Sequence, residues 1–194
     1  MFFLVFSQVG ADGDIHSAAR YGDISTLTRL INSNAPLDVQ DDLDFTPIHW
    51  AALEGHHDAI QVLVDAKASL DVQEGDGYTP LHYAAERGHS GAVQVLVDAK
   101  ASLEAPDYFD WTPLHRAAEN GHSDCVQMLV DTKANVDAQD ADGCFPLHRA
   151  AQKGHGDVVQ LLVDAKASFV TGDDRNASRL LAAAASGIPV TRPQ

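Results

Sequence analysis

A tetrapeptide of the form Thr-Pro-Leu-His recurs at a fixed interval along this chain. Its copies begin at Thr46, Thr79 and Thr112, 33 residues apart, and Phe145-Pro146-Leu147-His148 continues the register with Thr replaced. Each copy is followed by Ala-Ala and then by Gly-His at constant offsets. Self-similarity over a period of this length is typical of proteins built from stacked structural repeats. The register therefore predicts a repeat solenoid.

Each repeat is predicted to fold as two helices followed by an extended loop. Thr46 suits the N-cap of the first helix, and Pro47 suits its first turn, where a missing amide hydrogen costs nothing. Gly55 suits the end of this helix because glycine readily adopts the left-handed conformation of a tight turn. Apolar residues three positions apart, such as Ile60 and Leu63, give the second helix one buried face.

In these motifs the chain resembles the ankyrin-repeat family. The resemblance covers about residues 15–187 and implies an all-α solenoid of stacked helix-turn-helix units with projecting hairpin loops. We count five repeats and a C-terminal half-repeat in this domain, between an N-terminal segment at 1–14 and a tail at 188–194. A single repeat cannot bury its apolar faces alone, so we expect contacts between neighbouring repeats to supply most of the stability.

Two sets of residues depart from the family pattern, in which glycine is usual. Asp44 and Asp110 replace the loop glycine, and aspartate tolerates the left-handed region better than most residues. At the end of the second helix, lysine in the left-handed region costs about 1 kcal/mol relative to glycine. The residues at that position are Asn34, Lys67, Lys100, Lys133 and Lys166.

The composition of the chain indicates which kinds of partner it can bind and in which compartment it is located. The chain has 13 basic and 28 acidic residues and a net charge of −15, which argues against nucleic acids and anionic membranes. No run reaches the ~18 apolar residues of a membrane-spanning helix. The apolar stretch 1–6 lacks the basic flank and cleavage site of a secretory signal, and we interpret it as a repeat remnant or a packed end segment. Cys125 and Cys144 suggest no disulfide framework, which favours an intracellular, cytoplasmic location.

Nine of the ten histidines fall in two rows that the register fixes, and His57 is the exception. The resemblance implies that the histidine of the Thr-Pro-Leu-His motif forms hydrogen bonds between neighbouring loops. Equivalent histidines in adjacent repeats are too far apart to share an ion at the ~2 Å Zn–N distance. The sequence also lacks a phosphate-binding loop, a nucleophile elbow and a catalytic Cys–His pair. We therefore expect no metal, no cofactor and no catalytic residue.

Function is then expected at positions that the register leaves free. In ankyrin domains these are loop residues before Thr-Pro and outward residues of the first helix, which line the concave face. Aromatic and arginine side chains are frequent anchors of protein interfaces. The predicted partner-binding residues are Phe45, Trp50, Tyr78, Tyr83, Arg87, Tyr108, Phe109, Trp111, Arg116 and Arg149.

Two interpretations of these residues stay open. The rings of Phe45, Tyr78 and Trp111 share a position that often packs on the neighbouring loop. The basic residues either form a cationic strip that receives carboxylates or phosphates of a partner, or balance Glu86 and Glu119 within the same face. The basic residues concerned are Arg87, Arg116, Arg149 and Lys153.

The sequence therefore favours a non-catalytic adaptor that binds a protein partner on its concave face. One alternative is a structural subunit of a larger complex, in which a neighbour covers the last repeat and the apolar N-terminal segment. Such a subunit should aggregate when it is isolated. Another alternative is an inhibitor that blocks the cleft of an enzyme. The identity of the partner stays open.

Overall fold

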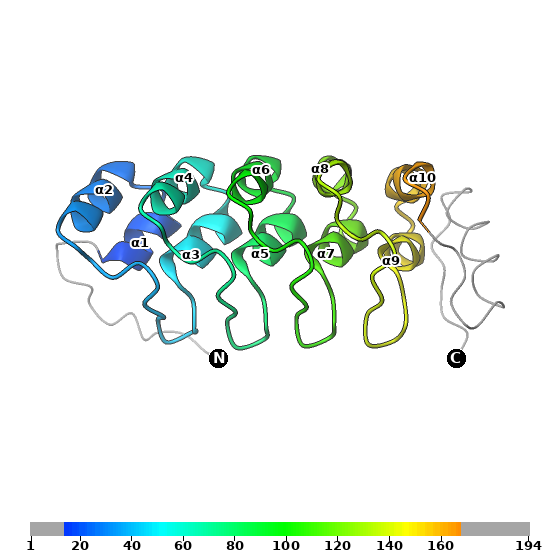
Figure 1. The fold of residues 1–194 in the computed structure, drawn as a ribbon, viewed down its shortest axis with the longest axis horizontal. Helices are drawn as coiled ribbons and strands as arrows, with labels where there is room; N and C mark the ends of the chain where they lie inside the picture. Colours follow the sequence, from blue (N-terminus) through cyan, green and yellow to red (C-terminus); the bar gives the residue numbers. More distant parts are fainter. Residues whose placement is uncertain (1–13, 168–194) are drawn as a thin grey trace, which may run out of the picture.

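The computed structural model describes residues 14–167, which form a row of five helix pairs (Figure 1). This part of the chain contains helices and loops but no strand, which confirms the predicted all-α solenoid. The predicted C-terminal half-repeat lies outside the described residues. The helix pairs are α1 (Ile15–Arg20) with α2 (Ile24–Asn32), α3 (Pro47–Glu54) with α4 (His57–Asp65), α5 (Pro80–Arg87) with α6 (Ser90–Asp98), α7 (Pro113–Glu119) with α8 (Ser123–Asp131), and α9 (Pro146–Lys153) with α10 (Gly156–Asp164).

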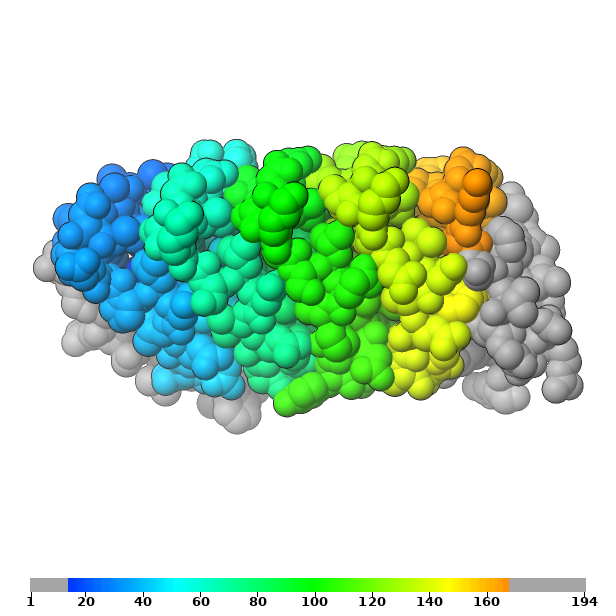
Figure 2. All heavy atoms as spheres, in the orientation of Figure 1, coloured from blue at the N-terminus to red at the C-terminus, as the bar shows by residue number. Residues whose placement is uncertain are grey.

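The helices lie in two layers (Figure 1). We call α1, α3, α5, α7 and α9 the inner helices, because the long loops project from their side, and the others the outer helices. Each inner helix packs on the inner helix of the next repeat, and each outer helix packs on the next outer helix. Figure 2 shows the repeats side by side in chain order. The stack therefore places corresponding loops next to one another.

The core repeats with the same period as the sequence. Alanine pairs at 51–52, 84–85, 117–118 and 150–151 are fully buried, and their small side chains let neighbouring inner helices approach closely. Large apolar residues from both layers fill the space between the helices and are buried almost completely. These residues are Ile48, Leu63, Leu81, Leu96, Leu114, Leu129, Leu147 and Leu162.

Histidines of the first row join inner helices to the loops that follow them. The backbone amide of Thr46 donates to Nδ1 of His49 at 3.2 Å. This bond leaves the ring proton on Nε2, which donates to the carbonyl of Tyr78 at 3.1 Å. His82 and His115 repeat this arrangement with the carbonyls of Trp111 and Cys144. The role that the resemblance implied is confirmed for these three histidines.

The second row of histidines joins neighbouring inner helices. Nε2 of His122 lies 2.9 Å from the carbonyl oxygen of Glu86, near the end of the preceding inner helix. Its ring packs so closely on Gly88 that a Cβ there would lie 2.5 Å from Nδ1. His89 and His155 form the equivalent bonds with Leu53 and Glu119. The scaffold thus uses both rows.

The left-handed residues lie where the register predicts them. Lys67, Lys100, Lys133 and Lys166 have φ between 64° and 74°, and Asn34 has φ 61°. Asp44 and Asp110, which replace the loop glycine, have φ of 61° and 57°. The predicted end of each second helix is therefore confirmed.

Candidate functional site

Each long loop turns around the carboxylate of one acidic residue. In the fourth repeat this residue is Asp107, whose Oδ1 accepts hydrogen bonds from the amides of Phe109 at 2.8 Å and Trp111 at 3.0 Å. Carboxylates at the same position of the other loops accept amide hydrogens two and four residues later in the same way. The corresponding residues are Asp41, Glu74 and Asp140.

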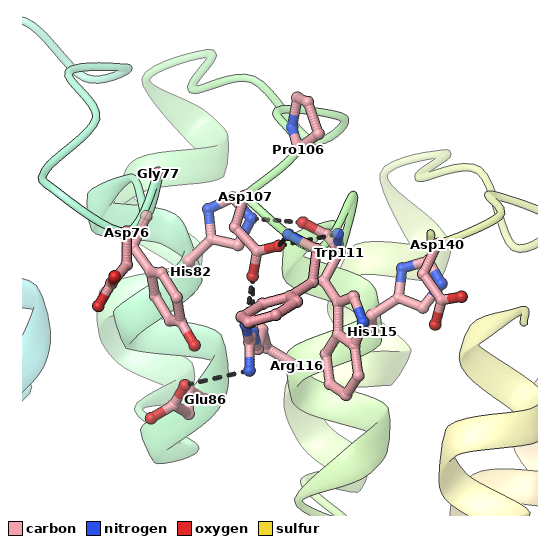
Figure 3. A network of polar contacts seen from close by, with 12 residues as sticks. Asp76, Gly77, His82, Glu86, Pro106, Asp107, Trp111, His115, Arg116 and Asp140 are labelled. Atoms are coloured by element: carbon pink, nitrogen blue, oxygen red, sulfur yellow. Dashed lines mark hydrogen bonds and ion pairs between the residues drawn. The ribbon is translucent and has the colours of Figure 1, made fainter. Parts of the chain in front are cut away.

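A side chain from the following inner helix completes most of these turns. Oδ2 of Asp107 accepts hydrogen bonds from Nε of Arg116 at 3.0 Å and from its Nη2 (Figure 3). Arg149 binds Asp140 and Asp142 through Nε and Nη2, at 2.6 to 2.8 Å. In the second repeat, Nε1 of Trp50 donates to Asp41 at 2.7 Å.

These contacts bear on the open interpretation of the basic residues. The Asp107 side chain is fully buried and that of Arg116 is 12% exposed, so the pair is shielded from water. Arg116 also lies 4.0 Å from Glu86, and Lys153 lies 3.2 Å from Glu119. Internal pairing is therefore the better description for Arg116, Arg149 and Lys153, with the loop acids as the main partners of the two arginines.

Aromatic rings enclose the same arginines. The guanidinium carbon of Arg116 lies 4.4 Å from the ring centres of both Tyr78 and Trp111, and that of Arg149 lies 4.7 Å from Trp111. A cation over an aromatic face is stabilised by about 0.5–2 kcal/mol, most strongly where water is excluded.

The stacking continues through the earlier repeats. Neighbouring rings have centroids 4.8 to 5.0 Å apart, and Arg20 closes the far end 4.3 Å from the ring of Trp50. We call this continuous set the aromatic–cation row. In spatial order it contains Arg20, Trp50, Phe45, Tyr83, Tyr78, Arg116, Trp111 and Arg149.

Seven of the ten predicted partner-binding residues thus belong to the aromatic–cation row. Phe45, Trp50, Trp111 and Arg149 are buried, while Tyr78, Tyr83 and Arg116 are half-buried. Direct contact with a partner stays a prediction for these seven. Arg20 was not among the predicted residues because it lies in the degenerate first repeat. Arg20 occupies the same position of its repeat as Leu53 and Glu86, which the register leaves free. A list of free positions that included the first repeat would therefore have contained Arg20.

The other three predicted residues are exposed. Tyr108 is 75% exposed and Phe109 is 61% exposed, at the tip of the loop 104–111 in the fourth repeat. The backbone beneath them is held by neighbouring loops: the amide of Tyr108 donates to the carbonyl of Asp76 at 3.1 Å, and the carbonyl of Phe109 accepts from Ala141 at 3.0 Å. Arg87, at the end of α5, is exposed and forms no ion pair within residues 14–167.

Three other features would point to a different function within the described residues: a metal site, a membrane-spanning helix and a reactive cysteine. Within 14–167, no three histidine, cysteine or acidic side chains are grouped so that they could hold a metal ion. None of the helices in this range is long and apolar enough to cross a membrane. Cys125 is fully buried, and burial raises the pKa of its thiol to about 11, so the thiol is protonated at neutral pH and is a poor nucleophile.

A row of helix pairs with hairpin loops defines the class of helical repeat proteins. Comparison with family models is more specific: the model described as ankyrin repeats (3 copies) matches residues 15–107 and 101–173. The chain belongs to the ankyrin-repeat family. Proteins of this family are generally protein–protein interaction modules and are typically non-catalytic. A search among curated proteins found no match.

Proposed function

We propose that this chain is a non-catalytic adaptor that binds a protein partner on its loop face. The loop face is the surface formed by loops 38–45, 71–78, 104–111 and 137–144 and the exposed sides of the inner helices. Its centre in this proposal is the pair Tyr108 and Phe109. The observation that carries the proposal is the exposure of these two adjacent rings on a hydrogen-bonded backbone.

The scaffold itself does not require these rings. The corresponding tips of neighbouring loops carry Gly75 with Asp76 and Ala141 with Asp142, and those loops form the same turns. An aromatic side chain can bury about 150–250 Å² in an interface, so two adjacent rings provide a large anchor. Large exposed apolar side chains that lie together are typical of interaction surfaces.

The structure around the rings supports tight binding. The amides of Tyr108 and Phe109 are already hydrogen-bonded within the protein, so little backbone freedom is lost when a partner docks. The aromatic–cation row joins the last residues of loops 38–45, 71–78 and 104–111 to side chains of the inner helices, which helps to fix the spacing of these loops. Tyr78 and Tyr83 are half-buried and extend the contact surface toward the second and third repeats. Arg87 adds a free cation at the far end of α5.

Photo-crosslinking tests this location directly. A photoreactive phenylalanine analogue is placed at Tyr108 in one variant and at Gln94, an exposed residue of outer helix α6, in the matched control. Both proteins are irradiated in extract of the source cell. The proposal predicts a discrete protein adduct from position 108 and none from position 94. An adduct from position 94 alone would place the partner on the outer helices and contradict the proposal.

A further inference from the structure

We infer that the segment received by the loop face is a basic stretch of a protein partner, rich in arginine or lysine. This inference rests on the proposed function, because it assigns a chemical class to the partner of the same surface. It follows from the charges that surround the exposed rings of Tyr108 and Phe109.

The four loops are acidic throughout. The ranges 38–45, 71–78, 104–111 and 137–144 contain four, three, three and three acidic residues, and no lysine, arginine or histidine. Several of these carboxylates have structural partners. Asp41, Glu74, Asp107 and Asp140 hold the turns, and Asp38, Asp71 and Glu104 accept amide hydrogens of the following repeat at 2.7 to 2.8 Å.

Four carboxylates at the tips are left without a cation. Asp42, Asp44, Asp76 and Asp110 are exposed, and none of them forms an ion pair within the described part of the chain. Asp110 directly follows Phe109, and Asp76 is joined to Tyr108 by the backbone hydrogen bond between the loops. Residues with unpaired negative charge are therefore neighbours of both aromatic residues, Asp76 through the backbone contact and Asp110 along the chain.

Exposed aromatic rings next to unpaired carboxylates favour a cationic partner over a neutral or an acidic one. A cationic side chain can lie over an aromatic face and donate charge-assisted hydrogen bonds to the adjacent carboxylates, while its aliphatic stem packs on the rings. A neutral segment could replace the hydrogen bonds of water to these carboxylates only with uncharged donors, which bind a carboxylate more weakly than a cation does. An acidic segment would be repelled, as would the loop face of a second copy of this chain.

Synthetic peptides test the charge class. Three short peptides share leucine and serine at the same positions and differ in carrying arginine, glutamate or glutamine at the others. Fluorescence anisotropy measures their binding to the full chain at low and at high salt. We expect the arginine peptide to bind at least about tenfold more tightly than the glutamine peptide at low salt, with the difference shrinking at high salt. Equal affinities, or binding of none of the peptides, would overturn the inference.

Matched variants separate a local site from general attraction to an acidic protein. Asp76→Asn with Asp110→Asn should weaken arginine-peptide binding by about fivefold, since each exposed ion pair contributes modestly. The control, Asp98→Asn with Asp131→Asn, removes the same charge from exposed positions of the outer helices and should change the affinity by less than about twofold. Equal weakening by both pairs would show non-specific attraction and overturn the inference.

Failure of this inference differs from failure of the proposed function. An adduct from position 108 that maps to a neutral or acidic partner segment would overturn the inference and leave the binding surface in place. An adduct from position 94 alone would overturn the surface itself. An adduct from position 108 that maps to a segment rich in arginine or lysine would support both.

Discussion

The guanidinium of Arg116 donates its Nε hydrogen to Oδ2 of Asp107 at 3.0 Å, which ties inner helix α7 to the loop that precedes it. The same guanidinium is stacked against the ring of Tyr78 in the previous loop. One side chain thus fixes its own loop and the spacing to the neighbouring loop. The exposed pair Tyr108 and Phe109 is built on this anchor.

Replacing Arg116 by Ala should therefore destabilise the protein. The change leaves the fully buried carboxylate of Asp107 without its cation, and breaking a buried pair in this way costs about 3 kcal/mol. Urea unfolding followed by circular dichroism measures the loss. Arg87→Ala is the control and should stay within about 0.5 kcal/mol of the wild type, because Arg87 is exposed and unpaired in the described structure. Similar effects of both changes would contradict the anchoring role.

The left-handed lysines provide a test of backbone strain. Lys100 has φ 71°, so Lys100→Gly should be neutral or stabilise the protein by up to about 1 kcal/mol, because relief of strain competes with the greater freedom of the unfolded chain. Lys100→Ala keeps the Cβ and should bring no such gain. Thermal and urea unfolding measure both variants. A loss of more than about 1 kcal/mol for Lys100→Gly would show that the lysine side chain has a stabilising role.

Truncation of the repeat core should be costly. Leu96 in α6 is fully buried, so Leu96→Ala should lower the free energy of unfolding by about 2–4 kcal/mol through lost burial and a residual cavity. Gln94→Ala, two residues away on the exposed side of the same helix, should have little effect. Equal losses from the two variants in urea unfolding would show that the stack does not depend on this layer.

Stability should fall in mild acid through the buried histidines. Burial lowers the pKa of His82 to about 4, and in the folded protein its Nδ1 accepts the amide hydrogen of Thr79. The unfolded chain takes up this proton near the ordinary histidine value of about 6.5. Stability is therefore complete above that pH and declines as the pH falls toward 4. Urea unfolding at several pH values should show a smaller decline for His82→Gln, and an unchanged decline would contradict this assignment.

The periodic features of the fold could be predicted from the sequence because they depend on local rules applied in register. Pro47 and Gly55 mark the ends of an inner helix, and the structure has α3 between them. The positive φ of Lys100 followed from its alignment with a family glycine. The 33-residue interval then placed each such feature in the other repeats.

The contacts of the candidate site could not be predicted in this way, because they join side chains of a loop to side chains of the helix that follows it. Arg116 and Asp107 are nine residues apart, and their pairing depends on the conformation of the chain between them. The sequence did contain a signal. Acidic residues recur at 41, 74, 107 and 140, and a residue that the register fixes in this way belongs to the scaffold, as the histidine rows do.

The most direct test of the account is the affinity of a crosslinked and identified partner for two double variants, measured by isothermal titration calorimetry. Tyr108→Ala with Phe109→Ala should weaken binding by at least about 2 kcal/mol, or roughly thirtyfold, while changing stability little. Gln94→Ala with Asp98→Ala on α6 should leave the affinity within about twofold of the wild type. If the α6 pair abolishes binding and the aromatic pair preserves it, the loop face is not the binding surface.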